Sequence, residues 1–353
     1  MKEGLLKDYF SNIQQNLSNV KEYFQPYLVE FREQVEKTKF EGKAIYVLDF
    51  LFIIYLLIIA LLGRVFVIRI NIITILLTFG ILTISVIMYK VEPSKFKKPF
   101  SLLLDFSPFI FIWLSYDSLA IVQEKLIYPR IHTTELYTFD MKFFSWMFRG
   151  LSPNEWFATT FSSLTVDVVF GFTYILHTVI PFIIIVLMLI GKDRNNIRFT
   201  VLSFSIVSLI SFITYVVFPA AAPWYIAQYG FDSPSPNISY SESVTAGLSR
   251  IDELLGINLF HTFYSFESNS FASLPSVHAA YAMSAALCAY NKWKKKSVIF
   301  TTPYVFAILF GAIYFYHHFA IDLIVGVTYS LIAHCLTKKI VKKANKNEKL
   351  LQK

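Results

Sequence analysis

The chain of 353 residues has little charge and almost no cysteine. Only 16% of its residues are Asp, Glu, Lys or Arg, while 55% are hydrophobic. A soluble protein needs about 25% charged residues for its surface, so this composition argues against one. The two cysteines, Cys288 and Cys335, lie in apolar stretches, which favours buried small side chains over a disulfide. The first 43 residues have no apolar core segment, so we expect no cleavable signal peptide.

The sequence contains long uncharged runs of apolar residues. The stretches from Ile53 to Leu62 and from Ile72 to Met88 are long enough to begin or complete a membrane span of about 20 residues. The sequence therefore predicts an all-α fold, a polytopic membrane helical bundle with about eight transmembrane helices. These are expected at 45–63, 70–89, 100–122, 166–190, 199–219, 273–290, 297–316 and 319–337.

The basic residues are distributed unevenly between the two sides of these spans. The loops on one side, together with the C-terminal tail, hold 18 Lys and Arg residues, against seven on the other side. Basic loops stay in the cytoplasm, so both termini should be cytoplasmic, most simply at the plasma membrane. The net charge of +8 then reflects orientation and lipid contact, and we expect no nucleic-acid partner.

The spans divide the chain into four expected parts. Residues 1–43 have apolar positions at helical spacing and suggest an amphipathic cytoplasmic segment on the membrane surface, although a solvated helix or a partner contact fits as well. Residues 44–99 hold two additional spans, 100–337 the core, and 338–353 a basic cytoplasmic tail. An outer loop at 220–272 is long enough to be functional, and we expect a partly ordered lid there.

The segment Ser273-Leu274-Pro275-Ser276-Val277-His278 places polar groups at the mouth of the sixth span. Pro275 fits the first turn of that helix, where its missing N–H costs nothing. Ser276 and neighbouring N–H groups would then offer hydrogen bonds to a phosphate, and His278 could protonate a leaving oxygen. A helix cap followed by an interfacial histidine is the alternative interpretation.

A second segment, His317-His318-Phe319-Ala320-Ile321-Asp322, joins spans seven and eight. His318 and Asp322 are four residues apart and share a helical face. A carboxylate that accepts the Nδ1–H would leave Nε2 as a directed nucleophile. A metal would need three or four ligands and no further ligand pattern appears, so we expect no metal and no other cofactor. His317 points about 100° away and is expected to support or pack.

The predicted topology brings these segments together. The two histidine segments and the stretch from Pro219 to Tyr225 all fall at the outer ends of their spans. This convergence predicts one active site at the outer membrane face. A transporter or channel would instead spread ionisable residues along a pathway, often with repeat symmetry, and no repeat is evident.

Four stretches in order resemble the type 2 phosphatidic acid phosphatase superfamily. They are similar to its branch of inositol-phosphorylceramide synthases and inositolphosphotransferase-like membrane proteins. The resemblance implies a six-helix catalytic core in spans three to eight, with His318 as the nucleophile that becomes phosphohistidine. It further implies that Asp322 orients His318, that His278 is the general acid and that Ser276 binds phosphate. The stretches are Phe218-Pro219-Ala220-Ala221-Ala222-Pro223-Trp224, Gly247-Leu248-Ser249-Arg250-Ile251-Asp252, Leu274-Pro275-Ser276-Val277-His278 and His317-His318-Phe319-Ala320-Ile321-Asp322.

The chain also departs from the superfamily pattern. Gly311 and Ala312 stand where Ser-Arg is expected, and the end of span five has no Lys-x6-Arg-Pro clamp. Fewer cations around the phosphate suit a phosphodiester, with one negative charge, better than a monoester with nearly two. Arg130 and Arg250 are the outer-loop candidates to restore a cation, or they are simply solvated. The expected substrate-binding residues are Ser276, Pro275, Trp224, Arg250 and Asp117.

These observations predict an integral membrane phosphotransferase. Its donor would be a membrane phospholipid, its acceptor a lipid or polyol alcohol, and the transferred group, from the resemblance alone, inositol phosphate. A lipid phosphatase acting on a phosphatidate or polyprenyl (pyro)phosphate is the alternative enzyme, and a transporter or channel the distant one. The sequence leaves the donor, the acceptor and the oligomeric state open.

Overall fold

The computed structural model describes residues 130–232, 243–265 and 269–351, together with Leu51, Ile54 and scattered helical positions between Asp105 and Leu119. Side chains are described as far as Lys343. The predictions for the segment 1–43 and for the span at 70–89 lie outside this part of the chain, and of the predicted spans at 45–63 and 100–122 only these scattered positions are described. Within it, the regular elements are helices, joined by two isolated β-bridges from Ala220, to His132 and to Ala272.

The helices follow in this order along the chain. They are α5 (Glu135–Phe144), the 3₁₀ helix η2 (Ser145–Phe148), α6 (Pro153–Thr160), α7 (Leu164–Ile190), α8 (Arg194–Val217), α9 (Pro223–Tyr229), the 3₁₀ helix η3 (Ser243–Leu248), α10 (Ser249–Leu255), α11 (Leu259–Ser265), α12 (Val277–Trp293), α13 (Lys295–Tyr314) and α14 (Ala320–Leu351).

Local polar caps fix where several helices begin. Ser163 accepts a hydrogen bond from the Val166 N–H at the start of α7, and Asp193 does the same for Asn196 in α8. Such caps satisfy N–H groups that have no partner inside the helix. The long apolar runs of α7 and α8 therefore start directly after a capping residue that the sequence itself marks.

Four helices, α7, α8, α13 and α14 as far as Lys343, are long and apolar enough to cross a membrane. The predicted all-α membrane protein is thereby confirmed. The count of eight spans and the six-helix core are not confirmed, since the first spans lie largely outside the described residues. At the predicted sixth span, α12 has 17 residues, and α14 continues as a helix through the predicted basic tail.

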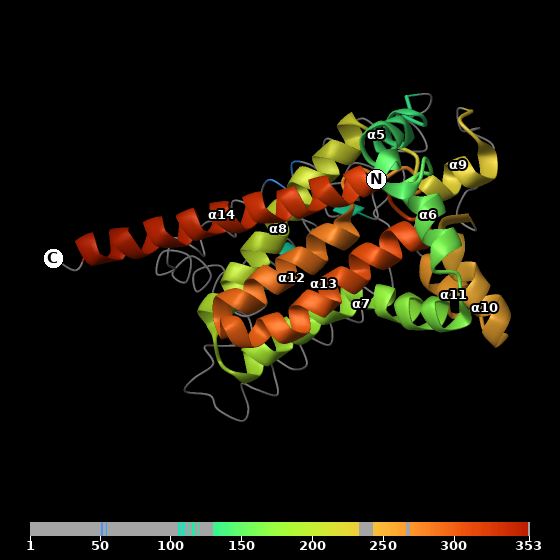
Figure 1. Ribbon diagram of the computed structural model, residues 1–353. Coiled ribbons are helices and arrows are strands. Elements are labelled where there is room, and N and C mark those ends of the chain that lie inside the picture. Colours follow the sequence, from blue (N-terminus) through green and yellow to red (C-terminus); the bar gives the residue numbers. More distant parts are fainter. Residues whose placement is uncertain are drawn as a thin grey trace, which may run out of the picture.

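The bundle is held together in part by hydroxyl groups between helices. α12 packs against α7, α8, α13 and α14, as the central position of its ribbon shows (Figure 1). Ser284 of α12 lies 2.8 Å from Ser330 of α14, and Ser208 of α8 lies 2.8 Å from the Tyr281 hydroxyl of α12. Small hydroxyl residues allow close helix packing in lipid, where the hydrophobic effect cannot drive association.

The start of α12 lies close to α14 beside Gly326. A Cβ atom on Gly326 would lie 2.3 Å from the Ser276 carbonyl oxygen, well inside van der Waals contact. Only glycine therefore allows the start of α12 to rest on the second turn of α14. This contact sets the distance between the two histidine segments.

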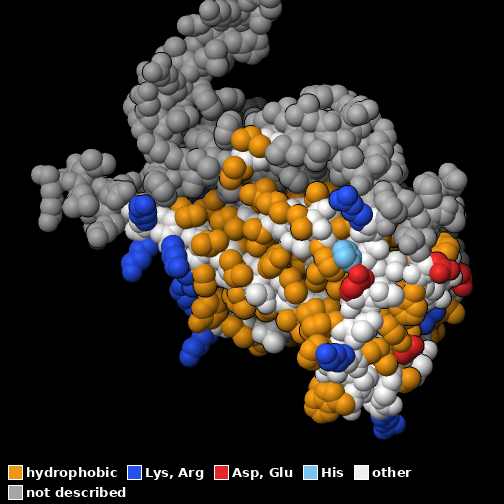
Figure 2. All heavy atoms as spheres, turned by 90° about the horizontal axis from the view of Figure 1, so that it is seen from above, with side chains coloured by type: hydrophobic (Ala, Val, Ile, Leu, Met, Phe, Trp, Pro, Cys, Tyr) orange, Lys and Arg blue, Asp and Glu red, His pale blue; other side chains and the backbone are white. Residues whose placement is uncertain are grey.

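The short helices gather at one end of the bundle, where α5, α6, α9, α10 and α11 lie together (Figure 1). The predicted outer loop 220–272 thus contains four helical elements, α9, η3, α10 and α11. Apolar side chains cover a broad face of the described surface (Figure 2). Several Lys and Arg side chains gather at one end of this face, and others lie near the Asp and Glu side chains toward its other end. A helix bundle of this kind suits a lipid environment along its length and water at its ends.

Candidate active site

Two histidines from the two predicted motifs meet at this end of the bundle. His278 lies in the first turn of α12, and His318 lies in the connection between α13 and α14. The His278 Nδ1 atom is 2.9 Å from the His318 Nε2 atom. Their side chains belong to residues that are only 7% and 4% exposed. His278 and His318 are forty residues apart in sequence, yet they form one hydrogen-bonded pair.

The other ring nitrogen of His318 is held by two acceptors. His318 Nδ1 lies 3.0 Å from the Ser273 carbonyl oxygen and 3.5 Å from Asp322 Oδ2. Both groups can only accept, so Nδ1 carries the proton and Nε2 carries the lone pair. The sequence predicted the carboxylate as the partner of Nδ1; the carbonyl is in fact the nearer of the two.

Asp322 is more distant because its oxygen is already engaged. Oδ2 accepts a 2.6 Å hydrogen bond from the Ser273 hydroxyl and a 2.9 Å hydrogen bond from the Phe319 N–H. Ser273 thus contacts His318 through its carbonyl and Asp322 through its hydroxyl. Asp322 therefore orients His318 partly through Ser273, which contacts both residues. The three residues form one buried hydrogen-bonded network.

Ser276 is the N-cap of α12, which corrects the predicted position of Pro275. The helix begins at Val277, so Pro275 lies before the cap and not in the first turn. Ser276 has an extended backbone, and its hydroxyl accepts from the Ala279 N–H at 3.2 Å. A serine hydroxyl satisfies a helix N–H, which a proline ring cannot do. Its O–H hydrogen still has a donor role available toward a ligand.

Backbone bonds lock the two motifs together. The Ser276 N–H donates to the Asp322 carbonyl at 3.0 Å, which ties α12 to the first turn of α14. The Ala312 carbonyl accepts from the N–H groups of both His317 and His318, each at 3.0 Å. The turn that carries His318 is therefore fixed at both ends by hydrogen bonds.

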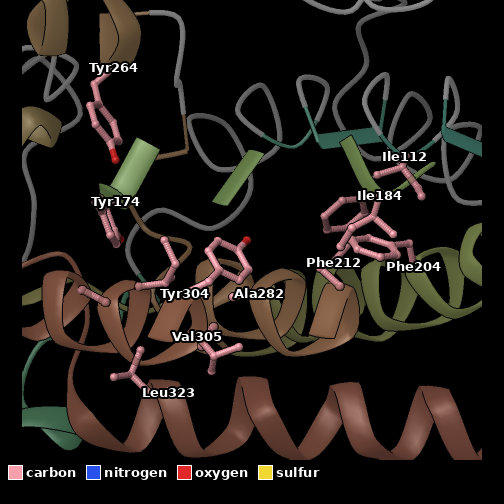
Figure 3. Packing of buried hydrophobic residues seen from close by; sticks show 14 of the residues in the cluster. Ile112, Tyr174, Ile184, Phe204, Phe212, Tyr264, Ala282, Tyr304, Val305 and Leu323 are labelled. Atoms are coloured by element: carbon pink, nitrogen blue, oxygen red, sulfur yellow. The ribbon is translucent and has the colours of Figure 1, made fainter. Parts of the chain in front are cut away.

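Aromatic rings surround the histidine pair. Tyr174 of α7 stacks on His278 with 4.9 Å between ring centroids, and the His177 ring lies 4.2 Å from that of His278. His317 lies 5.2 Å from the ring of Tyr174 and 4.9 Å from that of Tyr264, which points toward Tyr174 (Figure 3). Burial lowers the pKa of His317 to about 3, so it stays neutral. This agrees with the packing role expected for it.

Gly311 and Ala312 mark where the chain departs from the superfamily pattern, and Tyr174 explains the first of them. A Cβ atom on Gly311 would lie 3.0 Å from the Tyr174 ring, tighter than ordinary contact. The ring that stacks on His278 thus occupies the space beside position 311. A side chain at this position would require the Tyr174 ring to shift by a few tenths of an ångström.

Two polar residues reach the turn from α5 and α6. Asp140 accepts hydrogen bonds from the Ala320 and Ile321 N–H groups at 2.7 and 3.1 Å. Burial raises the pKa of the Asp140 carboxyl to about 7, against the lowering effect of these two donors. The Asn154 amide donates to the Ile313 carbonyl at 2.8 Å and to the His318 carbonyl at 3.0 Å.

The remaining predicted residues lie at different distances from the pair. The Trp224 N–H donates to the Tyr316 carbonyl at 2.9 Å, so α9 touches the turn before His317. Arg250 donates to Asp167 Oδ1 at 3.0 Å and lies 5.4 Å from the Tyr314 ring centroid. Its cation is thus engaged beside the start of α7 and the end of α13. Asp117 lies outside the described residues.

Sequence reasoning identified the histidine pair and Asp322 but not their supporting groups. It missed the double role of Ser273, and it assigned no role to Asp140 or Asn154. The spacing of Tyr174 and His177 on one face of α7 was the available signal for the aromatic surround. Among the described residues, no cluster of three or more His, Cys, Asp or Glu could hold a metal ion.

Comparisons with known proteins agree with this geometry. Residues 147–336 match the family model described as PAP2 superfamily. The phosphoinositol dihydroceramide synthase of Bacteroides thetaiotaomicron is 33% identical over 228 residues, which cover 64% of this chain and 73% of the relative. The catalytic subunit of the Saccharomyces cerevisiae inositol phosphorylceramide synthase is 31% identical, over 46% of this chain and 39% of that protein.

The inositol phosphorylceramide synthase of Candida albicans is 27% identical over 46% of this chain and 34% of its own length. The chain therefore spans well under half the length of these two fungal relatives, although it covers most of the bacterial one. No solved structure matches the chain. These matches confirm the expected superfamily and branch, and the expectation of an enzyme.

Proposed function

This chain belongs to the PAP2 superfamily, and we propose that it transfers phosphoinositol from a phospholipid to the hydroxyl of a ceramide-type lipid. The observation that carries the proposal is the His278–His318 pair, with Nδ1 of His318 held by two acceptors. This arrangement leaves Nε2 as the nitrogen with a lone pair. The names of the relatives support phosphoinositol as the group transferred and a ceramide as the acceptor.

In the first half of the proposed reaction, His318 Nε2 attacks the phosphorus of the donor diester. A P–N bond forms, the P–O bond to the diacylglycerol breaks, and the leaving oxygen takes a proton from His278. In the second half, the acceptor hydroxyl attacks the phosphohistidine and gives its proton to His278. The P–N bond breaks, the new phosphodiester leaves, and both histidines return to their initial states.

Burial of the site supports transfer over hydrolysis. His318 and His278 are almost fully enclosed, and aromatic rings cover His278 and His317. An enclosed site keeps water from competing with an alcohol for a reactive intermediate. The pairing of Arg250 with Asp167 further supports a singly charged diester, because it engages the cation that the sequence suggested for the phosphate.

We further propose that the site faces the outer side of the membrane and that both termini are cytoplasmic, as the basic loops indicate. The basic positions Lys338, Lys339, Lys342 and Lys343 lie in the C-terminal half of α14, and Figure 1 shows the C-terminal end of this helix far from α5 and α6. The histidine pair lies at the opposite end of α14. This separation supports the orientation.

The test compares purified wild-type protein with His318→Ala in detergent. Each is incubated with phosphatidylinositol and dihydroceramide, and mass spectrometry follows phosphoinositol ceramide, diacylglycerol and free inositol phosphate. We expect the new lipid and diacylglycerol in equal amounts from the wild type and none from His318→Ala. His261→Ala, at an exposed histidine of α11, is the matched control and should keep activity.

The phosphatase alternative is measured in a parallel tube with phosphatidate and a polyprenyl pyrophosphate. Release of phosphate without any transfer from phosphatidylinositol would overturn the proposed function. Transfer by both the wild type and His318→Ala would instead overturn the assignment of the nucleophile. The first result tests the proposed reaction and its substrate, and the second tests whether His318 is the nucleophile.

A further inference from the structure

Asn154 connects α6 to the backbone of the proposed nucleophile. Its Nδ2 group donates to the carbonyl of His318 and to the carbonyl of Ile313 in the last turn of α13. Asn154 is 2% exposed, so no water can replace these bonds. One amide thus bridges the end of a transmembrane helix and the residue that must attack phosphorus.

Asp140 holds the other side of the same turn. Its two oxygens accept from the Ile321 and Ala320 N–H groups, and the Phe319 N–H donates to Asp322. The Ala320 and Ile321 N–H groups in the first turn of α14, and the Phe319 N–H directly before it, therefore all donate to Asp side chains. Two bonds to one carboxyl group fix the direction of the helix start as well as its position.

The origin of this cap is unusual within the described bundle. α7, α8 and α12 are capped by the residue directly before each helix, whereas Asp140 is 180 residues away from Ala320 in sequence. Asp140 also lies outside the stretch 147–336 that matches the family model. Its bonds tie α5 to the catalytic turn, a connection that helix formation alone does not require.

We propose that Asp140 and Asn154 are positioning residues, which hold the α13–α14 turn from outside the bundle so that His318 Nε2 meets the phosphorus correctly. This inference rests on the proposed function in taking His318 as the nucleophile. Neither side chain touches the reacting atoms. Both act through the backbone on which His318 and Asp322 stand, where a displacement of about 1 Å can cost about 10²-fold in rate.

The first test compares Asp140→Asn with Asp193→Asn. Both replace a carboxylate at a helix N-terminus, one at the histidine end and the other at the start of α8. Asparagine keeps one acceptor oxygen, so Asp140→Asn loses one of its two bonds. We expect kcat to fall about tenfold with KM unchanged, since one of the two bonds that fix the turn is lost. Asp193→Asn should keep the wild-type kcat.

The second test compares Asn154→Asp with Asn291→Asp. Each change removes amide donors without altering side-chain volume, and the Asn291 amide bonds Asn196 in another part of the bundle. A carboxylate at position 154 would face the two carbonyls that the amide served. We expect a loss of 10- to 100-fold in kcat at unchanged KM for Asn154→Asp and none for Asn291→Asp.

The outcomes separate positioning from general stability. All rates are expressed per folded protein, measured by size-exclusion chromatography, and unfolding temperatures are recorded for each variant. Equal losses of kcat in the control variants, a rise in KM alone, or wild-type kcat in Asp140→Asn and Asn154→Asp would overturn the proposal. If one variant does not fold, the other decides; if neither folds, the residues are structural and the proposal is wrong.

Binding of orthovanadate distinguishes this proposal from the proposed function. Vanadate adopts the five-coordinate geometry of phosphoryl transfer, and transition-state analogues bind according to the alignment of the catalytic groups. If wild-type protein transfers no phosphoinositol, the proposed function fails, yet weaker vanadate binding by Asp140→Asn than by Asp193→Asn would still support positioning. Equal vanadate affinity in the two variants would overturn it.

Discussion

Replacing Gly326 by alanine should separate the two histidine segments. The new Cβ atom would lie 2.3 Å from the Ser276 carbonyl oxygen, which also accepts the first helical hydrogen bond of α12, from Ala280. No side chain can rotate to relieve this overlap because the opposing atom belongs to the backbone. The start of α12 must move by about 1 Å, with an overpacking cost of about 1–3 kcal/mol.

The consequence for activity is larger than the consequence for stability. Alanine gains about 1 kcal/mol over glycine inside a helix, which offsets part of the overpacking. The displacement nevertheless acts on the Ser276–Asp322 backbone bond and on the 2.9 Å contact between His278 and His318. We expect a loss of about 10²-fold in transfer rate with a small decrease in unfolding temperature.

The assay is phosphoinositol transfer per folded protein, with thermal unfolding in the same detergent. Gly171→Ala is the matched control, because its Cβ would meet Ile251 Cδ1 at 2.1 Å, the far end of a flexible side chain. That side chain can rotate away, so activity should persist. Wild-type activity in Gly326→Ala, or equal losses in both variants, would refute the reasoning.

Three further predictions address single interactions. Ser273→Ala removes the 2.6 Å hydrogen bond to Asp322 but keeps the carbonyl on His318, so kcat should fall about tenfold at constant KM in steady-state kinetics; an unchanged kcat would exclude this bond from catalysis. Burial raises the pKa of Asp140 from 3.8 to about 7, so the folded protein holds a proton that the unfolded chain has released. Stability should therefore fall as pH rises from about 4 to 7, and Asp140→Asn, scanned by unfolding temperature against pH, should lack this slope. Arg250→Ala breaks a partly exposed ion pair and should lower the unfolding free energy by less than about 1 kcal/mol; a loss of activity above tenfold in the transfer assay would instead place Arg250 on the phosphate.

The active-site expectation came from short-range chemistry that a sequence carries directly. His318 and Asp322 share a helical face at a spacing of four, and the structure keeps them at 3.5 Å. The apolar runs that predicted spans at 166–190, 199–219, 297–316 and 319–337 correspond to α7, α8, α13 and α14. The His318–Asp322 contact depends on spacing along one helix, and the four long helices depend on the apolar character of their own residues.

The groups that support the site could not be found in the same way. Nothing local relates Asp140 to Ala320, which is 180 residues away, or Asn154 to the His318 carbonyl. The short helices α5 and α6 offer no periodicity that points to a partner. Almost every residue has a backbone N–H and a carbonyl group. The identity of the residues whose backbone Asp140 and Asn154 contact therefore does not reveal the contact.

The sequence by itself determined the class of molecule and the order of its main helices, because hydropathy and helical spacing are local properties. It indicated the histidine pair through the predicted topology and the resemblance of the two motifs. The tertiary structure alone decided how that pair is held. Ser273 rather than Asp322 is the nearer partner of His318 Nδ1, and Tyr174 fills the space beside Gly311. These relations depend on the packing of distant segments at distances of a few ångströms, which no local pattern encodes.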